Sequence, residues 1–429
     1  MAYESGILAK KLQEKYSLEQ VKNKVYFLPE TFVNPWKVHL KESLDTLQFT
    51  ITDGYNNGDL AYSSYATAVR SRHMITTGTK IEDCKGDILK YIEYCRKINQ
   101  EIIVNLHQMV FGFLLSVEGK TKNATSYDYN EFAIKRFLET CEQVQFHLGI
   151  ALYNYFQLWS HVLFEKFENS IESVRASDRT LPYLSSMMHV AESFFLSSLL
   201  LLKSDSYIAT KFQQDKVTKN LQQLKIWEES CPENFSFLYS LVAAEKANVE
   251  GRYLDAIQLY EKSIASADKY AYTNYAALAN ELAGKFWILQ DNQTVASVYL
   301  TRSYELYQKW GAVVKCEHFQ ENYSNYIQKK YLASDSVSST DFEKTISSTT
   351  YSNTNTSTYS DYLDLASILK ASQAISKEIE YSKLMQKLIQ ILLESAGAER
   401  VIFFTQSQHK QIYVEAEGKN GFTNSYLKR

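Results

Sequence analysis

Residues 251–260 read Gly-Arg-Tyr-Leu-Asp-Ala-Ile-Gln-Leu-Tyr, and this stretch decides which fold the sequence predicts. The glycine marks a turn, because glycine reaches the backbone conformations that end a helix. The apolar residues after it have the three-and-four spacing of one helix face: Tyr253, Ala256, Ile257, Tyr260 and Ile264. Before the turn, another helix face is formed by Phe237, Leu241 and Ala244. The stretch therefore predicts two helices that fold back on each other.

The same pattern returns farther along the chain. The corresponding positions, each 40 residues apart, are Ala244 and Gly284, Ala256 and Ala296, and Tyr260 and Leu300. Small residues at such positions let two helices approach closely. A helix pair that recurs at a fixed period is typical of an α-solenoid, in which each pair contacts mainly its neighbours. We therefore predict a mainly α protein with an array of stacked helix pairs over residues 1–333.

The spacing of Gly251, Tyr253, Ala256 and Tyr260 resembles the second half of a tetratricopeptide repeat. The first half departs from that repeat, because Ser240 stands where the repeat usually carries Trp. The period is also longer than the usual ~34 residues. The array is therefore described as tetratricopeptide-like, and a plain helical bundle remains the alternative.

The composition changes abruptly over residues 334–360, where Ser, Thr and Asn dominate. Such a stretch buries too little apolar surface to offset its ordering entropy, so it is interpreted as a flexible linker. The following residues, 361–379, carry a short heptad seam that could support a homodimer. After a further predicted helix come two strand-like runs, Val401–Phe404 and Gln411–Val414.

Composition narrows the possible functions of the 429-residue chain. Its net charge is −3, which gives no electrostatic reason to expect nucleic acid as a partner. The longest apolar run, Phe194–Leu202, is shorter than the ~20 residues of a membrane span, so no membrane insertion is expected. The five cysteines form no CxxC pair, which favours buried thiols in a reduced, cytoplasmic setting.

Two short patterns suggest chemistry but do not meet its requirements. Gly119-Lys120-Thr121 resembles the end of a phosphate-binding loop, yet Leu114 replaces the required earlier glycine, so a polar loop after a buried helix is the better interpretation. His189 and Glu192 lie one helical turn apart and could share a metal, but the sequence offers no third ligand. We therefore predict no cofactor, no metal and no catalytic residue.

Longer blocks of the chain resemble part of a family of large multidomain signalling kinases. The blocks are residues 34–43 (Asn-Pro-Trp-Lys-Val-His-Leu-Lys-Glu-Ser), 57–62, 275–286, 364–376 and 395–400. In that family the order is a Ser/Thr kinase, an AAA-type ATPase, a helical region, a GAF domain and a histidine kinase. The resemblance implies that this chain begins inside the helical region, and that residues 361–429 are the first part of an α/β GAF domain.

The resemblance implies a regulatory or scaffold segment in signal transduction, not an enzyme, with protein partners or kinase domains as its targets. The alternative is a subunit or fragment of an ATPase or protein kinase whose catalytic domains lie on separate polypeptides. Tyr270, Tyr272 and Tyr275 are the candidate partner-binding residues, because aromatic side chains often anchor interfaces. They could equally form a buried seam between two helix pairs.

Overall fold

The computed structural model describes residues 2–168, 170–204, 206–208, 210–327, 400–406, 412–419 and 426–427. The chain divides into two compact units, residues 1–337 and 338–429, and each is described here by itself. The predicted linker (334–360), the heptad seam (361–379) and the helix after it lie outside the described residues.

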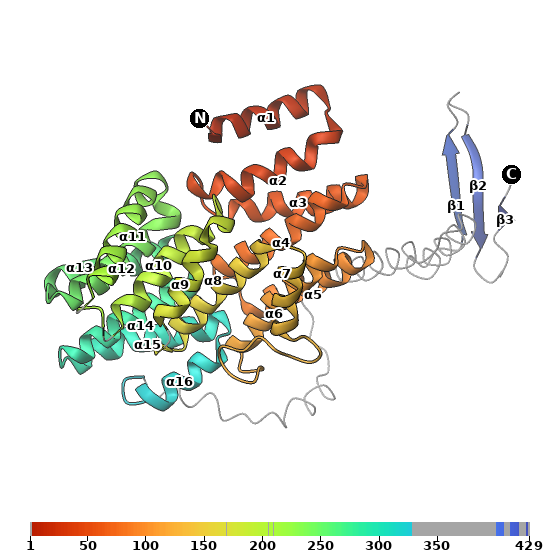
Figure 1. Cartoon of the computed structure of the whole chain (residues 1–429). Coiled ribbons are helices and arrows are strands. Elements are labelled where there is room, and N and C mark those ends of the chain that lie inside the picture. The colour runs from red at the N-terminus through yellow and green to blue at the C-terminus, as the bar shows by residue number, and fades with distance from the viewer. Residues whose placement is uncertain are drawn as a thin grey trace, which may run out of the picture. The chain divides into compact units, whose positions relative to one another are not determined.

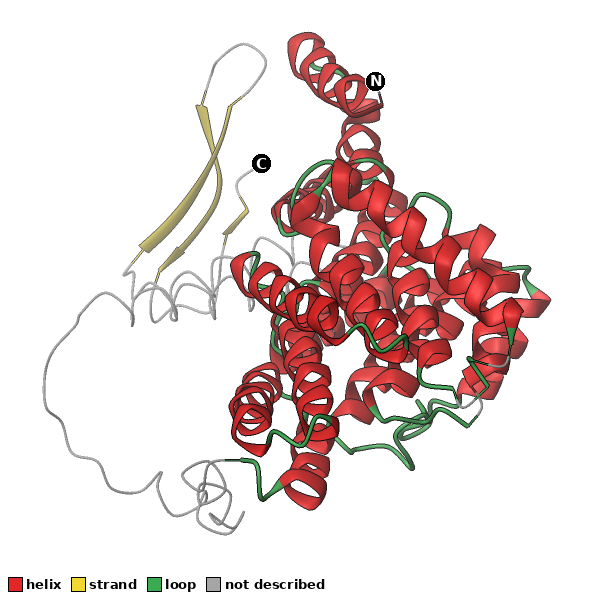
Figure 2. Ribbon diagram, turned by 90° about the vertical axis from the view of Figure 1, so that its left-hand side faces the viewer, coloured by secondary structure: helices red, strands yellow, loops and turns green. Residues whose placement is uncertain are grey.

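The described part of the first unit is built from sixteen α-helices joined by loops (Figures 1 and 2). The first six are α1 (Ala2–Tyr16), α2 (Lys22–Phe32), α3 (Glu42–Asn57), α4 (Leu60–Thr76), α5 (Ile81–Lys97) and α6 (Glu101–Val117). The next five are α7 (Ile134–Gln143), α8 (His147–Leu163), α9 (Ser170–Thr180), α10 (His189–Leu202) and α11 (Lys211–Ser230). The last five are α12 (Pro232–Val249), α13 (Tyr253–Lys269), α14 (Thr273–Leu289), α15 (Gln293–Trp310) and α16 (Val313–Tyr323). The prediction of a mainly helical protein is confirmed.

The connections between helices repeat one turn geometry. A residue with left-handed backbone follows many of the helices, and within three groups these residues are 20 or 21 positions apart: Gly58, Gly78, Asn99 and Gly119; Gln145, Glu165 and Ser186; Gly251, Ala271, Asp291 and Gly311. After α12, the N–H of Arg252 donates to the carbonyl of Ala247 at 2.9 Å, which closes the helix end. The turn predicted at Gly251 is therefore one of a series.

The close helix crossing predicted at residue 284 is present between α14 and α15. Gly284 is buried, and a Cβ built there would lie 2.6 Å from Cγ of Leu300 and 3.3 Å from its backbone nitrogen. Ala256 and Ala296 are also fully buried. The small residues thus stand where helices meet, as the 40-residue repeat predicts.

We expect Gly284→Ala to lower the free energy of unfolding by about 1–3 kcal/mol, because the added methyl group overpacks the crossing with Leu300. Urea unfolding followed by circular dichroism would measure the change. Gly86→Ala in α5 is the matched control, since a Cβ at Gly86 meets nothing within 4 Å. That control should stabilise the helix by about 0.5–1 kcal/mol. Equal effects of both substitutions would contradict the crossing.

Helices adjacent in the chain make most of the contacts within this unit, as an array of stacked pairs predicts, and helices far apart in the chain meet as well. One apolar core extends from Leu40 to Ile327. The amide of Asn274, at the start of α14, donates to the carbonyl of Ile75 in α4 at 3.2 Å. Gly311, directly after α15, packs against Ile81 at the start of α5, so α5 also contacts the last part of the series. The array is closed on itself, because its first and last thirds share one interior.

The apolar run Phe194–Leu202 lies in α10, whose side chains are largely buried in this core. Among the described residues, no helix has both the length and the apolar character needed to cross a lipid bilayer.

The described residues of the second unit form a small antiparallel sheet. Its strands are β1 (Arg400–Gln406), β2 (Ile412–Lys419) and β3 (Tyr426–Leu427), in the order β1-β2-β3. The pairing of β1 and β2 shifts register between Phe403 and Phe404. The strand predicted at Val401–Phe404 is confirmed as part of β1. The strand predicted at Gln411–Val414 is confirmed from residue 412 onward as part of β2. The sequence analysis did not predict β3.

Candidate functional site

Tyr270 and Tyr272 lie at the turn before α14 and Tyr275 lies in its first turn, and Tyr272 and Tyr275 are buried. Tyr272 has 0% and Tyr275 has 1% of its surface exposed, and burial raises the pKa of both phenols well above the usual value. Tyr270 is half-buried, and its carbonyl lies 3.0 Å from Nε2 of His39. The groove interpretation is wrong for Tyr272 and Tyr275, because side chains without exposed surface cannot anchor a partner. The buried seam, the other interpretation, is what the structure contains.

This seam holds the segment 34–43, the first block of the family resemblance, through one buried amide. Oδ1 of Asn234, at the start of α12, accepts hydrogen bonds from the N–H of Leu40 at 3.0 Å and the hydroxyl of Tyr272 at 2.7 Å. Its Nδ2 donates to the carbonyls of Pro35 at 2.7 Å and Val38 at 2.8 Å. Asn234 thereby satisfies three backbone groups of a segment about 200 positions away.

Aromatic stacking and hydrogen bonds extend the same contact. Trp36 stacks on Phe235 with ring centroids 5.4 Å apart and lies 5.1 Å from Trp227. Lys41 donates to the carbonyl of Ala271 at 3.0 Å. We call residues 34–41 with Asn234 and Tyr272 the closing clamp, because they join the N-terminal helices to α12 and α14.

Beside the clamp, α4, α8, α10 and α14 bury one carboxyl group. Thr76 donates to Oε2 of Glu192 at 3.2 Å, and the hydroxyl of Tyr275 donates to Oε1. Burial raises the pKa of Glu192 to about 7, against the hydrogen bonds from Tyr275, Tyr155 and Thr76, which favour the charged form. Such a carboxyl could exchange a proton near neutral pH, but Glu192 has no exposed surface through which a substrate could reach it.

The basic side chains of Arg72, His73, His107 and His189 are also buried in the first unit. Burial lowers the pKa of Arg72 to about 10, and burial with the charge of Arg72 lowers the pKa of His73 and of His107 to about 3. Burial, Arg72 and His73 lower the pKa of His189 well below its usual value. The ring of His189 packs edge-on against Tyr155 at 4.9 Å, and neither ring nitrogen has a hydrogen-bond partner among the residues that the structure describes. Within the described ranges, no three His, Cys, Asp or Glu side chains are placed to hold a metal.

A second buried cluster ties α16, the last helix of the described residues, to the core. Lys315 lies 2.7 Å from Glu281 of α14 and 3.3 Å from Glu165, while Lys285 lies 2.6 Å from Glu281 and 2.7 Å from Glu165. Burial alone would raise the pKa of Glu281, but the charges of Lys285 and Lys315 outweigh it and hold the pKa well below its usual range. A cavity of about 80 Å³ beside Glu165, Glu281 and Lys285 has room for a few water molecules.

Replacing Lys315 by Met is expected to lower the free energy of unfolding by about 2–3 kcal/mol, because Glu281 stays buried with only Lys285 as a cation. Thermal unfolding at neutral pH would measure it. Lys309→Met is the control, since Lys309 is exposed and makes no ion pair with a described residue. A loss no larger than that of the control would show that the ion pair contributes nothing to holding α16.

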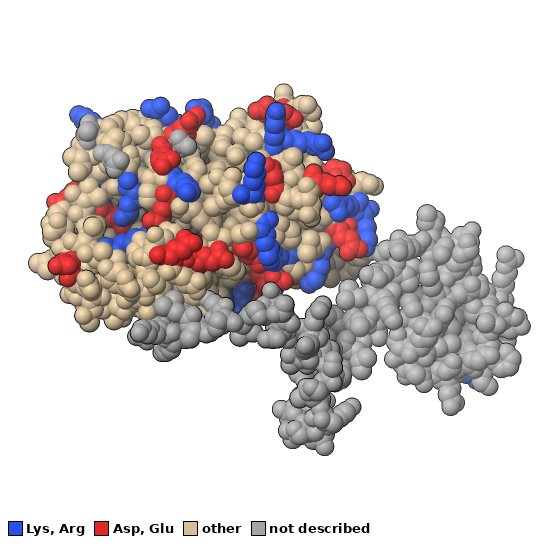
Figure 3. Space-filling view, turned by 90° about the horizontal axis from the view of Figure 1, so that it is seen from below, with Lys and Arg blue, Asp and Glu red and all other residues tan. Residues whose placement is uncertain are grey.

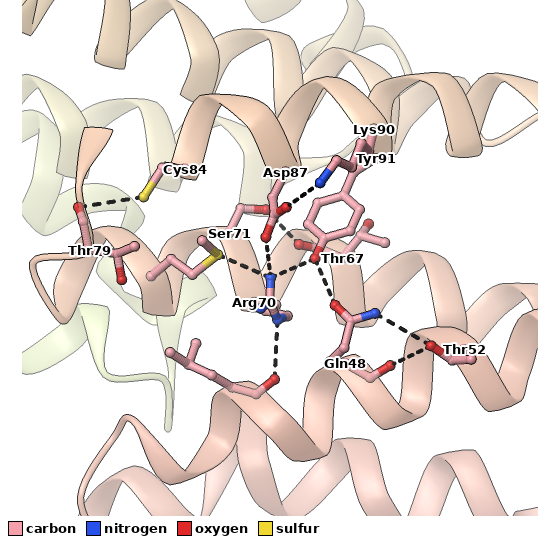
Figure 4. A network of polar contacts seen from close by, with 12 residues as sticks. Gln48, Thr52, Thr67, Arg70, Ser71, Thr79, Cys84, Asp87, Lys90 and Tyr91 are labelled. Carbon is pink, nitrogen blue, oxygen red and sulfur yellow. Dashed lines mark hydrogen bonds and ion pairs between the residues drawn. The ribbon is translucent and has the colours of Figure 1, made fainter. Parts of the chain in front are cut away.

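A third polar network joins α3, α4 and α5 (Figure 4). Nη1 of Arg70 donates to Oδ2 of Asp87 at 2.8 Å and to the hydroxyl of Tyr91 at 2.8 Å, and that hydroxyl donates to Gln48 at 3.3 Å. Each member has a protein partner, so the network serves to hold the three helices together.

The remaining sequence patterns have structural explanations. Gly119-Lys120-Thr121 follows α6 rather than a strand, and Gly119 packs against Val314, as expected for a loop after a buried helix. The surface in Figure 3 carries positive and negative side chains intermixed, without one broad field of either sign. Four cysteines are buried and Cys316 is half-buried, and all five are free thiols.

Sequence reasoning missed the buried clusters. The only local signal was the presence of ionisable residues within otherwise apolar helices, such as Glu192 in α10 and Glu281 in α14. Their partners come from helices far away in the chain, so the clusters cannot be read from any one helix.

Comparison with known proteins gives a limited result. No family model matches the chain. A segment of 116 residues, 27% of the chain, is 26% identical to the hybrid signal transduction histidine kinase G of Dictyostelium discoideum. The match spans 3% of the length of that kinase. This similarity weakly supports a role in signal transduction.

Proposed function

We propose that the chain is a non-catalytic regulatory segment in signal transduction, which mediates protein–protein or interdomain contacts in a multidomain kinase system. The observation that carries the proposal is the closed helical unit, in which the clamp at Asn234 joins segments about 200 positions apart. Contacts between distant segments suit a part that positions other domains, because they fix the arrangement of its helices. The similarity to a signalling histidine kinase supports the same context.

The state of the ionisable groups supports a non-catalytic role. Glu192, Glu281 and Lys315 are almost fully buried and bonded to neighbouring side chains. Groups of this kind stabilise or position helices, whereas a catalytic group has to reach a substrate. The proposal includes a cytoplasmic location, homodimer formation and a GAF-like second unit.

The alternative is a subunit of an ATPase or protein kinase reconstituted from separate polypeptides, and the similarity to a kinase favours keeping it. A neighbouring reading frame that encodes an ATPase or the rest of a GAF domain would support this alternative.

Assays with labelled ATP and Mg²⁺ test the proposal directly. The purified full chain is expected neither to hydrolyse ATP nor to phosphorylate itself. Added to a kinase encoded by a neighbouring frame, it should change the rate of that kinase without acquiring turnover of its own. Saturable ATP turnover that persists through repurification would overturn the non-catalytic assignment. An unchanged rate of the neighbouring kinase would contradict the regulatory one.

A further inference from the structure

The regular spacing of the turns is interrupted between α6 and α7 by a connection of residues 118–133. Connections of this length without regular secondary structure are uncommon in a compact domain and often carry a function. This one contains a two-residue antiparallel bridge, in which Tyr129 and Phe132 exchange backbone hydrogen bonds of 3.2 and 2.9 Å.

The connection is anchored to the helices beneath it. Tyr127 is fully buried, and its hydroxyl lies 2.8 Å from Oγ of Ser160 in α8. The backbone passes so close to α6 that a Cβ on Gly112 would lie 2.3 Å from the carbonyl oxygen of Tyr127. Asp128 accepts a hydrogen bond of 2.7 Å from the N–H of Ile134 and so caps α7. These contacts hold the connection in one position.

A groove of about 710 Å³ lies between α5, α6, this connection and α7. Three half-buried aromatic rings line it: Phe111 lies 5.4 Å from Tyr129, which lies 5.5 Å from Phe132. Burial raises the pKa of Tyr129 to about 12, so its phenol is neutral. The groove therefore offers apolar surface in a preformed shape.

Two arginines and two amides in the groove have side chains without a partner among the described residues. Arg96 and Arg136 are exposed and make no ion pair there, while Glu131 is the one carboxylate in the described lining. The amides of Asn105 and Gln108, three positions apart on α6, are half-buried and make no hydrogen bond with a described residue.

We infer that this groove binds an acidic segment of a partner protein in an extended conformation. An extended chain presents free N–H and C=O groups. The carbonyl oxygens of the Asn105 and Gln108 side chains can accept from its N–H groups, and their NH₂ groups can donate to its C=O groups. The guanidinium groups of Arg96 and Arg136 match carboxylates of such a segment. Alternate apolar side chains would pack on the aromatic lining. The inference specifies the partner chemistry of the interaction role proposed above and rests on it.

A labelled peptide that alternates Asp or Glu with Leu or Phe is the probe, and its counterpart with Lys or Arg at the charged positions is the control ligand. Fluorescence anisotropy with the full chain should show saturable binding of the acidic peptide, weakened by salt. The double variant Arg96→Glu and Arg136→Glu should weaken binding by at least about tenfold. The matched variant Arg175→Glu and Arg179→Glu on α9, which makes the same change in net charge outside the groove, should change it by less than about twofold.

A third variant tests the extended form. The double variant Asn105→Ala and Gln108→Ala keeps every charge. It should lower the affinity for the acidic peptide several-fold, which corresponds to the loss of about one or two hydrogen bonds. Circular dichroism melting of each variant checks that the fold persists.

Several outcomes would overturn the inference. They are no saturable binding of the acidic peptide, equal binding of the basic peptide, equal losses in the groove and α9 variants, or unchanged binding in the amide variant. A concentration-dependent dimer that the groove variant abolishes and the peptide cannot displace would assign the groove to a second copy of the chain. These results leave the ATP and kinase assays unaffected, so failure here is distinguishable from failure of the proposed function.

Discussion

Replacing Asn234 by Ala is expected to lower the free energy of unfolding by about 3–5 kcal/mol, although only one small side chain is lost. The reason is that the amide is fully buried and makes four hydrogen bonds, three of them to backbone groups of residues 35–40. The substitution leaves these groups and the hydroxyl of Tyr272 buried without partners, and each costs about 1–3 kcal/mol when no relaxation or water compensates. Urea unfolding would measure the loss.

Asn322→Ala is the control, because Asn322 is exposed and makes one hydrogen bond to the carbonyl of His318 within α16. It should change stability by less than about 0.5 kcal/mol. Hydrogen exchange adds a spatial test. If the clamp closes the array, Asn234→Ala should reduce protection in both residues 34–57 and α14. Loss confined to α12 would contradict that closing role.

The folded unit is expected to lose stability steeply as the pH falls below about 6.5. His73, His107 and His189 are neutral in the folded state, because burial and the charge of Arg72 lower each pKa, to about 3 for His73 and His107. Below pH 6.5 the unfolded chain binds protons that the folded chain does not, and each such histidine costs about 1.4 kcal/mol per pH unit.

Glu192 acts in the opposite direction over part of this window. Its pKa is raised to about 7 from the ordinary value of 4.5, so between these limits the folded chain binds the extra proton. Its stabilising contribution is complete below pH 4.5 and is lost as the pH rises towards 7. Three histidines outweigh one carboxyl, so a net loss of roughly 3 kcal/mol per pH unit is expected between pH 6.5 and 4.5. Other groups facing the cluster are Tyr155 and Tyr275, whose raised pKa values keep both neutral in this range.

His189→Phe separates this cause from general acid unfolding. The ring of His189 has no hydrogen-bond partner to lose, and Phe keeps the aromatic contact with Tyr155. The variant should therefore be more stable than the parent, with a gain about 2 kcal/mol larger at pH 5 than at pH 8. His147→Phe is the control, because His147 is exposed and stacks on Tyr183. Parallel pH profiles for the parent and His189→Phe would refute the role of the buried ring.

The fold class could be predicted because the helix period is a local property. The repeat around Gly251 located α12 to α15, and the pairing of Gly284 with Leu300 follows from the same 40-residue spacing. Other turns escaped prediction because Ala271 and Asp291 adopt left-handed backbone that glycine usually occupies. The strand β3 also gave no local signal, since it is two residues long.

The candidate site was harder to predict than the fold. Tyrosine is a residue type that is common at interfaces. The residues next to Tyr272 and Tyr275 in the sequence do not show whether these two side chains lie on the surface or in the interior. Their burial depends on segment 34–43 and on α4, α8 and α10, which come from other parts of the chain. Within the groove, Arg96 and Arg136 look like ordinary surface cations until α5 and α7 are placed side by side.

By itself the sequence determined the mainly helical class, the helix pairing from residue 237 onward and the first strands of the second unit, because spacing and turn residues act over a few positions. Only the tertiary structure decided that the array closes, that Asn234 holds the N-terminal segment, and that Glu192, Glu281 and the three histidines are buried. The physical reason is that small rotations between successive helix pairs add up along the chain. The accumulated rotation decides which helix faces from distant parts of the chain come into contact. A local sequence pattern does not encode this accumulated rotation.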